Sequence, residues 1–349
     1  MEDIFNKEEF NEDDELFTAL VETTIERIKI AYERTDGKIY MSFSGGKDST
    51  VLAHLVMMAN LPTHIPFVFS NTGIELNAIK EFVDNFPYDN VVQVKPRKPF
   101  AQVLKENGKP AINKIRANHL GIYQNHMDAP FESRTARQMI TGIREKDGVQ
   151  MPGQTCKVKL ANKHMHFLHP DTEFKISNSC CMYLKKYPFK DFEKEHDMNG
   201  SMSGVRVAEG GARAMKYKSC TTITHKHNKE FVHSTPIYDW TDEDVDKFIE
   251  KYNIEISRAY TVYGCTRTGC SACPFSKNIK YDLKVLWDYE PLKYKAMMHW
   301  LKDVYIYQGV ECEWDEEYME EFNRMQPIIE QRRKEMMDKF RPNGSNNED

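Results

Sequence analysis

The chain has 349 residues and a formal net charge of −5 at pH 7, with 48 Lys and Arg against 53 Asp and Glu. This length suits one α/β domain of roughly 200–250 residues with additions. The charge excludes a molecule that is basic as a whole, as non-specific nucleic-acid binding usually requires, but it permits a local basic groove. The N-terminus lacks the basic flank and apolar stretch of a signal peptide, and no run of about 18 apolar residues occurs. We therefore expect a cytoplasmic protein that does not cross a membrane.

Strand and helix patterns alternate through the first hundred residues. The predicted strands are residues 38–43, 65–70 and 91–94, and the predicted helices are residues 15–34, 48–56 and 76–86. Such alternation predicts a parallel sheet covered by helices on both faces. Ligands bind such sheets outside the carboxyl ends of the strands. The turns that follow the first two strands, residues 44–46 and 71–73, should therefore face one pocket.

The remainder of the chain is less regular. Residues 100–175 predict mostly short helices and loops, and strands are expected at 203–205 and 232–238. Thr241, with Asp244 three residues later, predicts a helix N-cap, and residues 280–338 have a helical pattern. We divide the chain into four parts: an N-terminal helix (1–35), a main α/β domain (36–280), a helical extension (281–340) and a tail expected to be disordered (341–349).

The turn at residues 44–49, Ser-Gly-Gly-Lys-Asp-Ser, joins a strand end to a helix start. Free backbone N–H groups and the helix dipole favour an anion at such a junction, and the two glycines let a phosphate approach the backbone. The hydroxyls of Ser44 and Ser49 can donate to phosphate oxygens, and Lys47 adds a positive charge. Asp48 can cap the helix or hold a magnesium ion. A plain Gly-Gly turn with a capping Asp is the alternative, but the whole hexapeptide favours a pyrophosphate site.

Two segments resemble the nucleotide motifs of a known family. Residues 42–49 match the SGGxDS pattern of the PP-loop in ATP pyrophosphatases, and residues 71–75, Asn-Thr-Gly-Ile-Glu, resemble the second nucleotide motif of the phosphoadenosine phosphosulfate (PAPS) reductase family. For the second segment, a turn with an N-capping Thr is the alternative. The resemblance implies catalytic roles for Lys47 and Asp48, and nucleotide contacts from Ser42, Phe43, Ser44, Gly45, Gly46, Ser49, Asn71, Thr72, Gly73 and Glu75.

A third segment, residues 203–213, is similar to the glycine, acid and arginine segment of the same family, with Gly210 where a serine is usual. The resemblance implies that Gly204 contacts the nucleotide. Arg206 and Arg213 would act as catalytic anion clamps, since a planar guanidinium matches pairs of phosphate or sulfate oxygens. Arginines that follow a strand are also often simply solvated.

The chain contains eight cysteines, and in a reducing cytosol clustered thiols indicate metal or redox chemistry before disulfides. Cys180 and Cys181 are adjacent, and Cys270 and Cys273 form a CxxC pair. Adjacent cysteines have diverging side chains, which suits an iron–sulfur cubane better than a mononuclear zinc site. Zinc and ordinary reduced cysteines are the alternatives.

The cysteine segments, residues 180–189 and 269–274, resemble the cluster-binding segments of adenylylsulfate reductases. The resemblance implies that Cys180, Cys181, Cys270 and Cys273 hold a four-iron four-sulfur cluster near the sulfate of the nucleotide. Cys265 could replace one of the adjacent pair as a ligand, and Cys220 is a weaker candidate.

One departure from the family concerns the nucleophile. Its reductases carry a nucleophilic cysteine near the C-terminus, whereas no cysteine follows Cys312 in this sequence. Cys312 lies between Glu311 and Glu313, which should raise its pKa and weaken it as a thiolate. We expect Cys312 to be structural.

The resemblance covers residues 35–280 and implies an adenine-nucleotide α-hydrolase-like, doubly wound parallel sheet with a helical C-terminal extension. It implies an enzyme of sulfur metabolism that binds ATP with Mg²⁺, or an adenylyl-sulfate nucleotide. Three functions are considered: an ATP-dependent sulfurtransferase acting on a nucleic acid or other acceptor, which we prefer; a reductase that makes sulfite; and a nucleotide-sensing module without turnover. Lysines that could form a basic patch for nucleic acid, or only a solvated face, are Lys157, Lys159, Lys163, Lys175, Lys185, Lys186 and Lys190.

Overall fold

The computed structural model describes residues 12–129, 132–156, 159–209, 219–226 and 229–312, together with Arg324 and Gln331. The strands are β1 (Ile39–Phe43), β2 (Phe67–Ser70), β3 (Val91–Val94), β4 (Ile143–Lys146), β5 (Val149–Thr155), β6 (Gly200–Ser203), β7 (Thr221–Lys226) and β8 (Lys229–Ser234). The α-helices are α1 (Glu12–Arg34), α2 (Lys47–Met58), α3 (Asn77–Asp84), α4 (Phe100–Asn107), α5 (Lys114–Gln124), α6 (Arg134–Thr141), α7 (Ser179–Cys181), α8 (Tyr187–Glu195), α10 (Asp242–Lys251), α11 (Arg258–Thr261), α12 (Ile279–Tyr289) and α13 (Pro291–Tyr307). Two 3₁₀ helices are η1 (Asn162–Leu168) and η3 (Val207–Glu209), and a π-helix is η2 (Met182–Lys186).

A six-stranded sheet with the order β3-β2-β1-β6-β8-β7 forms the centre of the molecule. Every neighbouring pair from β3 to β8 is parallel, and β7 pairs antiparallel with β8 at the edge. The predicted parallel sheet is confirmed. Because β1 lies inside the sheet, its carboxyl end lies between the carboxyl ends of β2 and β6.

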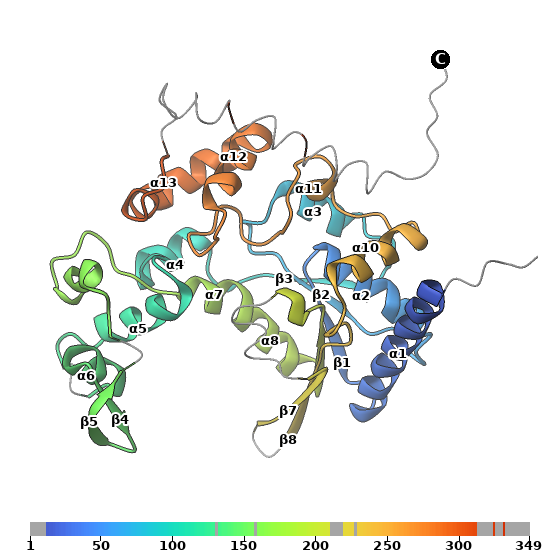
Figure 1. The fold of residues 1–349 in the computed structure, drawn as a ribbon, viewed down its shortest axis with the longest axis horizontal. Helices are drawn as coiled ribbons and strands as arrows, with labels where there is room; N and C mark the ends of the chain where they lie inside the picture. The colour runs from blue at the N-terminus through green and yellow to red at the C-terminus, as the bar shows by residue number, and fades with distance from the viewer. Residues whose placement is uncertain are drawn as a thin grey trace, which may run out of the picture.

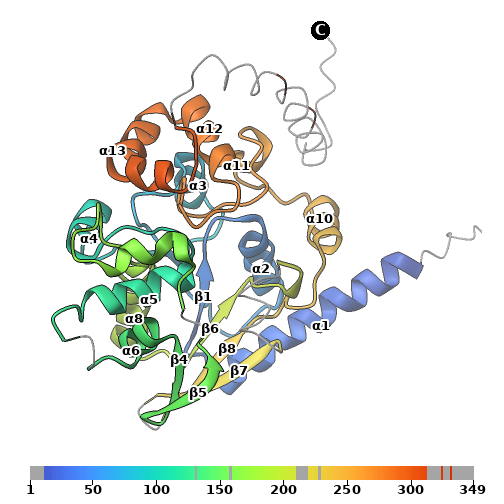
Figure 2. The ribbon, with the colours of Figure 1, turned by 60° about the vertical axis from the view of Figure 1, so that its left-hand side comes forward.

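Helices cover both faces of this sheet, as expected for a doubly wound fold. Side chains of β1 and β2 alternate between the faces: Met41 and Phe67 belong to the large core that includes α1 and α2, whereas Tyr40 and Val68 pack with Phe192 of α8. Figure 2 shows α1 and α2 on one side of the strands and α8 on the other.

Two predicted strands are shifted in the structure. The strand expected at 203–205 ends at Ser203, because the chain then passes close to α2: a Cβ on Gly204 would lie 2.9 Å from the carbonyl oxygen of Asp48. The strand expected at 232–238 ends at Ser234, and Pro236 cannot donate to a strand ladder. The capping box of Thr241 and Asp244 is confirmed at the start of α10.

Residues 100–175 contain more than short helices and loops, because β4 and β5 form a separate antiparallel hairpin. The hairpin lies with α5 and α6 at the end of the molecule away from α1 (Figure 1). Its register depends on the turn Asp147-Gly148, where both residues have positive φ. Residues 100–175 therefore include a strand pair that the sequence pattern did not indicate.

The helices α12 and α13 of the predicted extension pack against the main domain. Leu283, Leu286, Leu301 and Val304 are buried in the same core as the central sheet. Figure 1 shows both helices on the side of α3 and α11. Apart from Arg324 and Gln331, the pattern expected beyond residue 312, including the tail at 341–349, lies outside the described residues. Within the described part of the chain, no helix has the length and apolar character needed to span a membrane.

Candidate functional site

The glycine turn lies at the carboxyl end of β1, where the parallel sheet predicts a ligand site. Gly45 has a φ of +68°, which favours glycine, and Gly46 is the N-cap of α2 without a side-chain cap. The hydroxyl oxygens of Ser44 and Ser49 are 3.0 Å apart, and Ser49 donates to the carbonyl of Gly46 at 2.9 Å. The N-terminus of α2 and two hydroxyls thus converge on one turn, an arrangement suited to a phosphate. The side chain of Phe43 is buried in the core, so only its backbone borders this turn.

Tyr260 and Thr268 cover this turn, and sequence reasoning missed both. The backbone N–H of Lys47 donates to the Tyr260 hydroxyl at 3.1 Å, and that hydroxyl lies 3.0 Å from Oγ1 of Thr268. A Cβ on Gly46 would lie 2.9 Å from the same Thr268 oxygen. Burial raises the pKa of Tyr260 to about 12, so its hydroxyl remains protonated at neutral pH. In the sequence, the one feature that could have pointed to Thr268 as a site residue is its position between Cys265 and Cys270.

The ammonium group of Lys47 points to α10. Its Nζ lies 3.2 Å from Oδ1 of Asp246 and 3.8 Å from Oδ1 of Asp242. The side chains of Lys47 and Asp246 are only 17% and 12% exposed, so the pair is largely shielded from solvent. In the structure the charge that we predicted for a phosphate is therefore paired with carboxylates of α10.

Arg206 is one of the most enclosed charged residues, with a side chain that is 3% exposed. Its Nε donates to Asp48 at 3.0 Å, and its two terminal nitrogens donate to Asp242 at 2.6 Å and to the carbonyl of Trp240 at 3.2 Å. The structure thus brings Lys47, Asp48 and Arg206 together beside the turn, and all three take part in one ionic network. Arg213 lies outside the described residues.

The second nucleotide turn follows β2, and the carboxylate of Glu75 accepts hydrogen bonds from within the turn. The hydroxyl and the backbone N–H of Thr72 donate to the two carboxylate oxygens of Glu75, at 2.6 and 3.1 Å. Gly73 has a φ of +79°, and Asn71 donates to Gln93 at 3.1 Å. Both turns lie at the carboxyl edge of the sheet, as the sequence predicted.

The backbone of this second turn pairs with the cysteine segment. Glu75 and Cys270 form an isolated antiparallel bridge, and the N–H of Ser271 donates to the carbonyl of Ile74 at 2.9 Å. The glycine turn approaches the same segment through Thr268. The second nucleotide turn therefore contacts the CxxC pair directly, and the glycine turn lies beside Thr268, two positions before that pair.

The four predicted cysteine ligands come from two distant segments and influence one another. The thiol of Cys180 donates a hydrogen bond to Cys181, which lowers the pKa of Cys181 to about 6 and raises that of Cys180. Charges on Cys270 and Cys273 raise the pKa of Cys180 further. Burial itself raises the pKa of Cys270, and it raises that of Cys273 to about 12. These mutual effects on the pKa values place the CC pair within electrostatic range of the CxxC pair.

Lys185 lies between the thiols and the second nucleotide turn. The negative charge of Cys270, to which it is hydrogen-bonded, raises the pKa of Lys185, and Glu75 and Cys181 act in the same direction against burial. This lysine is therefore directed inward and does not belong to a solvated basic patch. Of the other lysines proposed for that patch, Lys157 lies outside the described residues.

The predicted cluster would be held by four cysteine thiols. Four thiols with neighbouring positive charge suit an iron–sulfur cluster, because thiolates are its usual ligands. Among residues that the structure describes, no three His, Cys, Asp or Glu side chains are grouped as they would be around a single metal ion. The residues present thus fit the cluster in their chemistry, and its presence remains a prediction.

A sequence profile identifies the family of the chain. The profile of the phosphoadenosine phosphosulfate reductase domain matches residues 38–112 and 114–276, which include both nucleotide turns and all four cysteines. The chain belongs to the PAPS reductase family. No curated protein matches its sequence.

Solved structures share the fold of this PAPS reductase family member at low identity. PAPS reductase from Candida auris, in a phosphate complex, is 13% identical with a TM-score of 0.40, over 74% of this chain and 95% of that chain. FMN adenylyltransferase from Candida glabrata with ATP is 13% identical with a TM-score of 0.42, over 73% and 62%. The U34-tRNA thiolase NcsA from Methanococcus maripaludis, with its [4Fe-4S] cluster, is 13% identical with a TM-score of 0.36, over 85% and 83%. These similarities are too low to transfer a substrate.

Three further cysteines differ in their surroundings. Cys265 is buried, and its charge contributes to the raised pKa of Tyr260, which places it toward the glycine turn. Cys312 is 5% exposed, and its thiol donates to the carbonyl of Val310 at 3.2 Å. Cys220 lies at the start of β7, where its carbonyl accepts from the N–H of Thr235.

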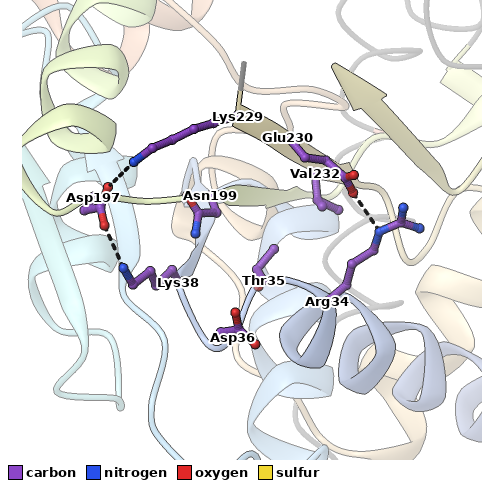
Figure 3. A pocket seen from close by; sticks show the side chains of 9 residues that line it. All are labelled: Arg34, Thr35, Asp36, Lys38, Asp197, Asn199, Lys229, Glu230 and Val232. Carbon is purple, nitrogen blue, oxygen red and sulfur yellow. Dashed lines mark hydrogen bonds and ion pairs between the residues drawn. The ribbon is translucent and has the colours of Figure 1, made fainter. Parts of the chain in front are cut away.

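A surface depression of about 390 Å³ lies at the opposite edge of the sheet, where β1, β6 and β8 begin. Lys38 and Lys229 both point to Asp197, at 2.6 and 3.4 Å, and Arg34 pairs with Glu230 at 2.9 Å (Figure 3). The depression is lined by Arg34, Thr35, Asp36, Lys38, Asp197, Asn199, Lys229, Glu230 and Val232. Its lysines and its arginine are thus paired with acids, and we assign the nucleotide to the carboxyl edge instead.

Proposed function

We propose that this member of the PAPS reductase family is an ATP-dependent sulfurtransferase. The glycine turn would bind the pyrophosphate part of ATP with Mg²⁺, and the cysteine site would handle sulfur for transfer to an acceptor. A nucleic acid is the preferred acceptor class, although other acceptors fit the same chemistry.

The observation that carries this proposal is the closeness of the two nucleotide turns to the CxxC segment. Thr268 stands over Gly46 of the glycine turn and is only two positions from Cys270. On the other side of the segment, Glu75 pairs with Cys270 itself. A nucleotide held by these turns would border the thiol site, as a transfer between the two requires.

The reaction would proceed in two balanced steps. An oxygen of the acceptor attacks the α-phosphorus of ATP, the bond to the bridging oxygen breaks, and pyrophosphate leaves. A sulfur nucleophile then displaces AMP from the activated acceptor. The amides at the start of α2 would stabilise the charge that develops on the pyrophosphate. Cys180, Cys181, Cys270 and Cys273 would hold a four-iron four-sulfur cluster, which when bound supplies a site for sulfide or for electrons.

A reductase that makes sulfite is the second candidate, because the family takes its name from that reaction. Attack on a sulfonate needs an accessible thiolate. Cys312 is buried, with its backbone carbonyl bonded to the hydroxyl of Tyr294 at 2.8 Å. This burial disfavours Cys312 as the nucleophile and supports the ATP-dependent route.

The bond that is cleaved distinguishes these functions. Anaerobically purified protein should convert ATP and Mg²⁺ to AMP and pyrophosphate when the right acceptor, tested first among nucleic acids, is present. With PAPS or adenylylsulfate, thioredoxin and reductant, we expect no sulfite.

Thioredoxin-dependent sulfite that survives Cys312→Ser would refute the proposal and indicate attack by Cys265 or Cys220. Sulfite formation that disappears in Cys312→Ser would refute it in favour of Cys312. ATP binding without turnover on any acceptor would support a nucleotide-sensing module.

A further inference from the structure

Helix α13 holds the segment between the two cysteines of the CxxC pair. The hydroxyl of Tyr305 donates to the carbonyl of Ala272 at 2.7 Å, and the side chain of Gln308 donates to the carbonyl of Pro274 at 2.9 Å. Tyr305 is 0% exposed, so no water can replace its hydroxyl from bulk solvent. A helix outside the nucleotide motifs therefore fixes the backbone of the cysteine segment.

Ala272 needs such support because of its backbone conformation. Its φ is +45°, in the left-handed region that L-residues with a Cβ rarely adopt. The residue is 1% exposed, so without Tyr305 its carbonyl would lack a partner in a buried place. Loss of the tyrosine hydroxyl should therefore let the segment relax, and Cys270 and Cys273 would change their relative positions.

The same helix also bonds the turn that pairs with Cys270. The ammonium of Lys293 donates to the carbonyl of Glu75 and to Oδ1 of Asn77, the latter at 2.9 Å. Glu290, which precedes α13, accepts from the N–H of Asn77 at 2.6 Å. Both sides of the Glu75–Cys270 bridge are thus bonded to α13 or to its N-cap residue.

We propose that Tyr305 is a positioning residue that sets the geometry of the Cys270–Cys273 pair, with Lys293 as the second anchor of the same bridge. The proposal gives α13 a role in the cysteine site, although α13 contains none of the family motifs. It rests on the proposed function only in that these cysteines are taken to be cluster ligands.

Tyr305→Phe tests this proposal against a matched variant, Tyr294→Phe. Tyr294 lies on the same helix, is also buried, and donates to the carbonyl of Cys312 rather than to the CxxC segment. Each variant loses one buried tyrosine hydroxyl, so a general loss of stability affects both. In anaerobic protein challenged with an iron chelator, Tyr305→Phe should lose its iron about fivefold faster than wild type, the factor expected for one hydrogen bond. Tyr294→Phe should lose it at the wild-type rate.

A second measurement does not require iron. In the iron-free full chain, the rates of alkylation of Cys270 and Cys273, measured by mass spectrometry, should increase in Tyr305→Phe and not in Tyr294→Phe. Adding Ala272→Gly to Tyr305→Phe should restore slower alkylation, because glycine adopts the positive φ without strain. Equal rates in the two tyrosine variants would overturn the proposal. A wild-type chain that binds no iron would contradict the cluster alone, since the alkylation comparison still tests Tyr305.

Discussion

The glycine turn and the cysteine site are built in different ways. Residues 44–49 are contiguous, and the bonds of Ser49 to Ser44 and Gly46 lie within the turn itself. The cysteine site joins residues 180–181 to residues 270–273, and α13 holds the second segment from outside. A site made from one turn is encoded locally, whereas a site made from two segments depends on the packing of the rest of the chain.

A change in the glycine turn should remove one site and leave the other. In Gly46→Val the side chain would meet Thr268 and block the approach of phosphate to the backbone, so ATP affinity should fall at least about 100-fold while the fold and the iron content persist. Calorimetry with ATP and iron analysis check this. Gly269→Ala is the control, because a Cβ there meets nothing within 4 Å. Unchanged ATP affinity in Gly46→Val would remove the nucleotide assignment, and loss of iron would show that the two sites are not separable.

The reciprocal change should remove the cluster. Wild-type protein prepared without oxygen should be brown with about four irons per chain, and Cys270→Ser should be colourless while it still binds ATP. Absorption spectra, iron and sulfide analysis, and calorimetry provide the measurements. Cys156→Ser is a suitable control, because Cys156 is buried beside Gln138 in another part of the chain. Stoichiometric zinc without visible absorption in the wild type would contradict the predicted cluster.

Acid should lower the free energy of unfolding of the protein through His54, which lies on the helix that follows the glycine turn. Burial lowers the pKa of His54 on α2 to about 4, from about 6.5 in an unfolded chain. Between these values the unfolded chain binds more protons, so the free energy of unfolding falls as the pH falls from 6.5 to 4, by about 2 kcal/mol after allowance for partial exposure. In His54→Gln, an amide that does not titrate replaces the imidazole beside Tyr88. Urea unfolding at pH 7 and 4.5 should show a smaller pH effect in this variant, and an equal effect would exclude His54 as its source.

The smallest expected effect concerns the ionic network beside the turn. Arg206→Lys keeps the charge but cannot reach Asp48, Asp242 and the Trp240 carbonyl together, so ATP affinity should fall about tenfold without loss of the fold. Arg258→Lys is the control, since the ion pair that Arg258 forms with Glu81 is exposed. Equal ATP affinities in the two variants, measured by calorimetry, would show that the network does not shape the nucleotide site.

The sequence predicted the regular, local parts of the molecule well. The strand at 91–94 is confirmed residue for residue, and the first strand and its helix differ from prediction by one or two residues. These elements follow from apolar patterns and a glycine turn, which act over short range. The strand at 203–205 was misplaced because Gly204 leaves the sheet to pass the backbone of Asp48, and this approach involves a distant segment.

Contacts between residues that are far apart in the chain could not be predicted from the sequence. Tyr260 contacts the glycine turn across 213 positions in the chain, and Tyr305 bonds Ala272 from a helix without any family motif. No periodicity or spacing identifies such a partner, because the bond depends on how whole elements pack. The predicted cysteine set and nucleotide turns were brought together by the fold, while their ligands remain predictions.

The hydrogen bond from Tyr305 to Ala272 also affects when the cysteine site can form during synthesis of the chain. A ribosome makes β1, the glycine turn and α2 early, and N-terminal parts of a protein can fold while synthesis continues. The CxxC segment, by contrast, emerges before the tyrosine that fixes it. During that interval the spacing of Cys270 and Cys273 is not yet fixed. Iron delivery should therefore follow completion of α13, and a chain halted between residues 273 and 305 should be a poor recipient in a cell-free translation assay.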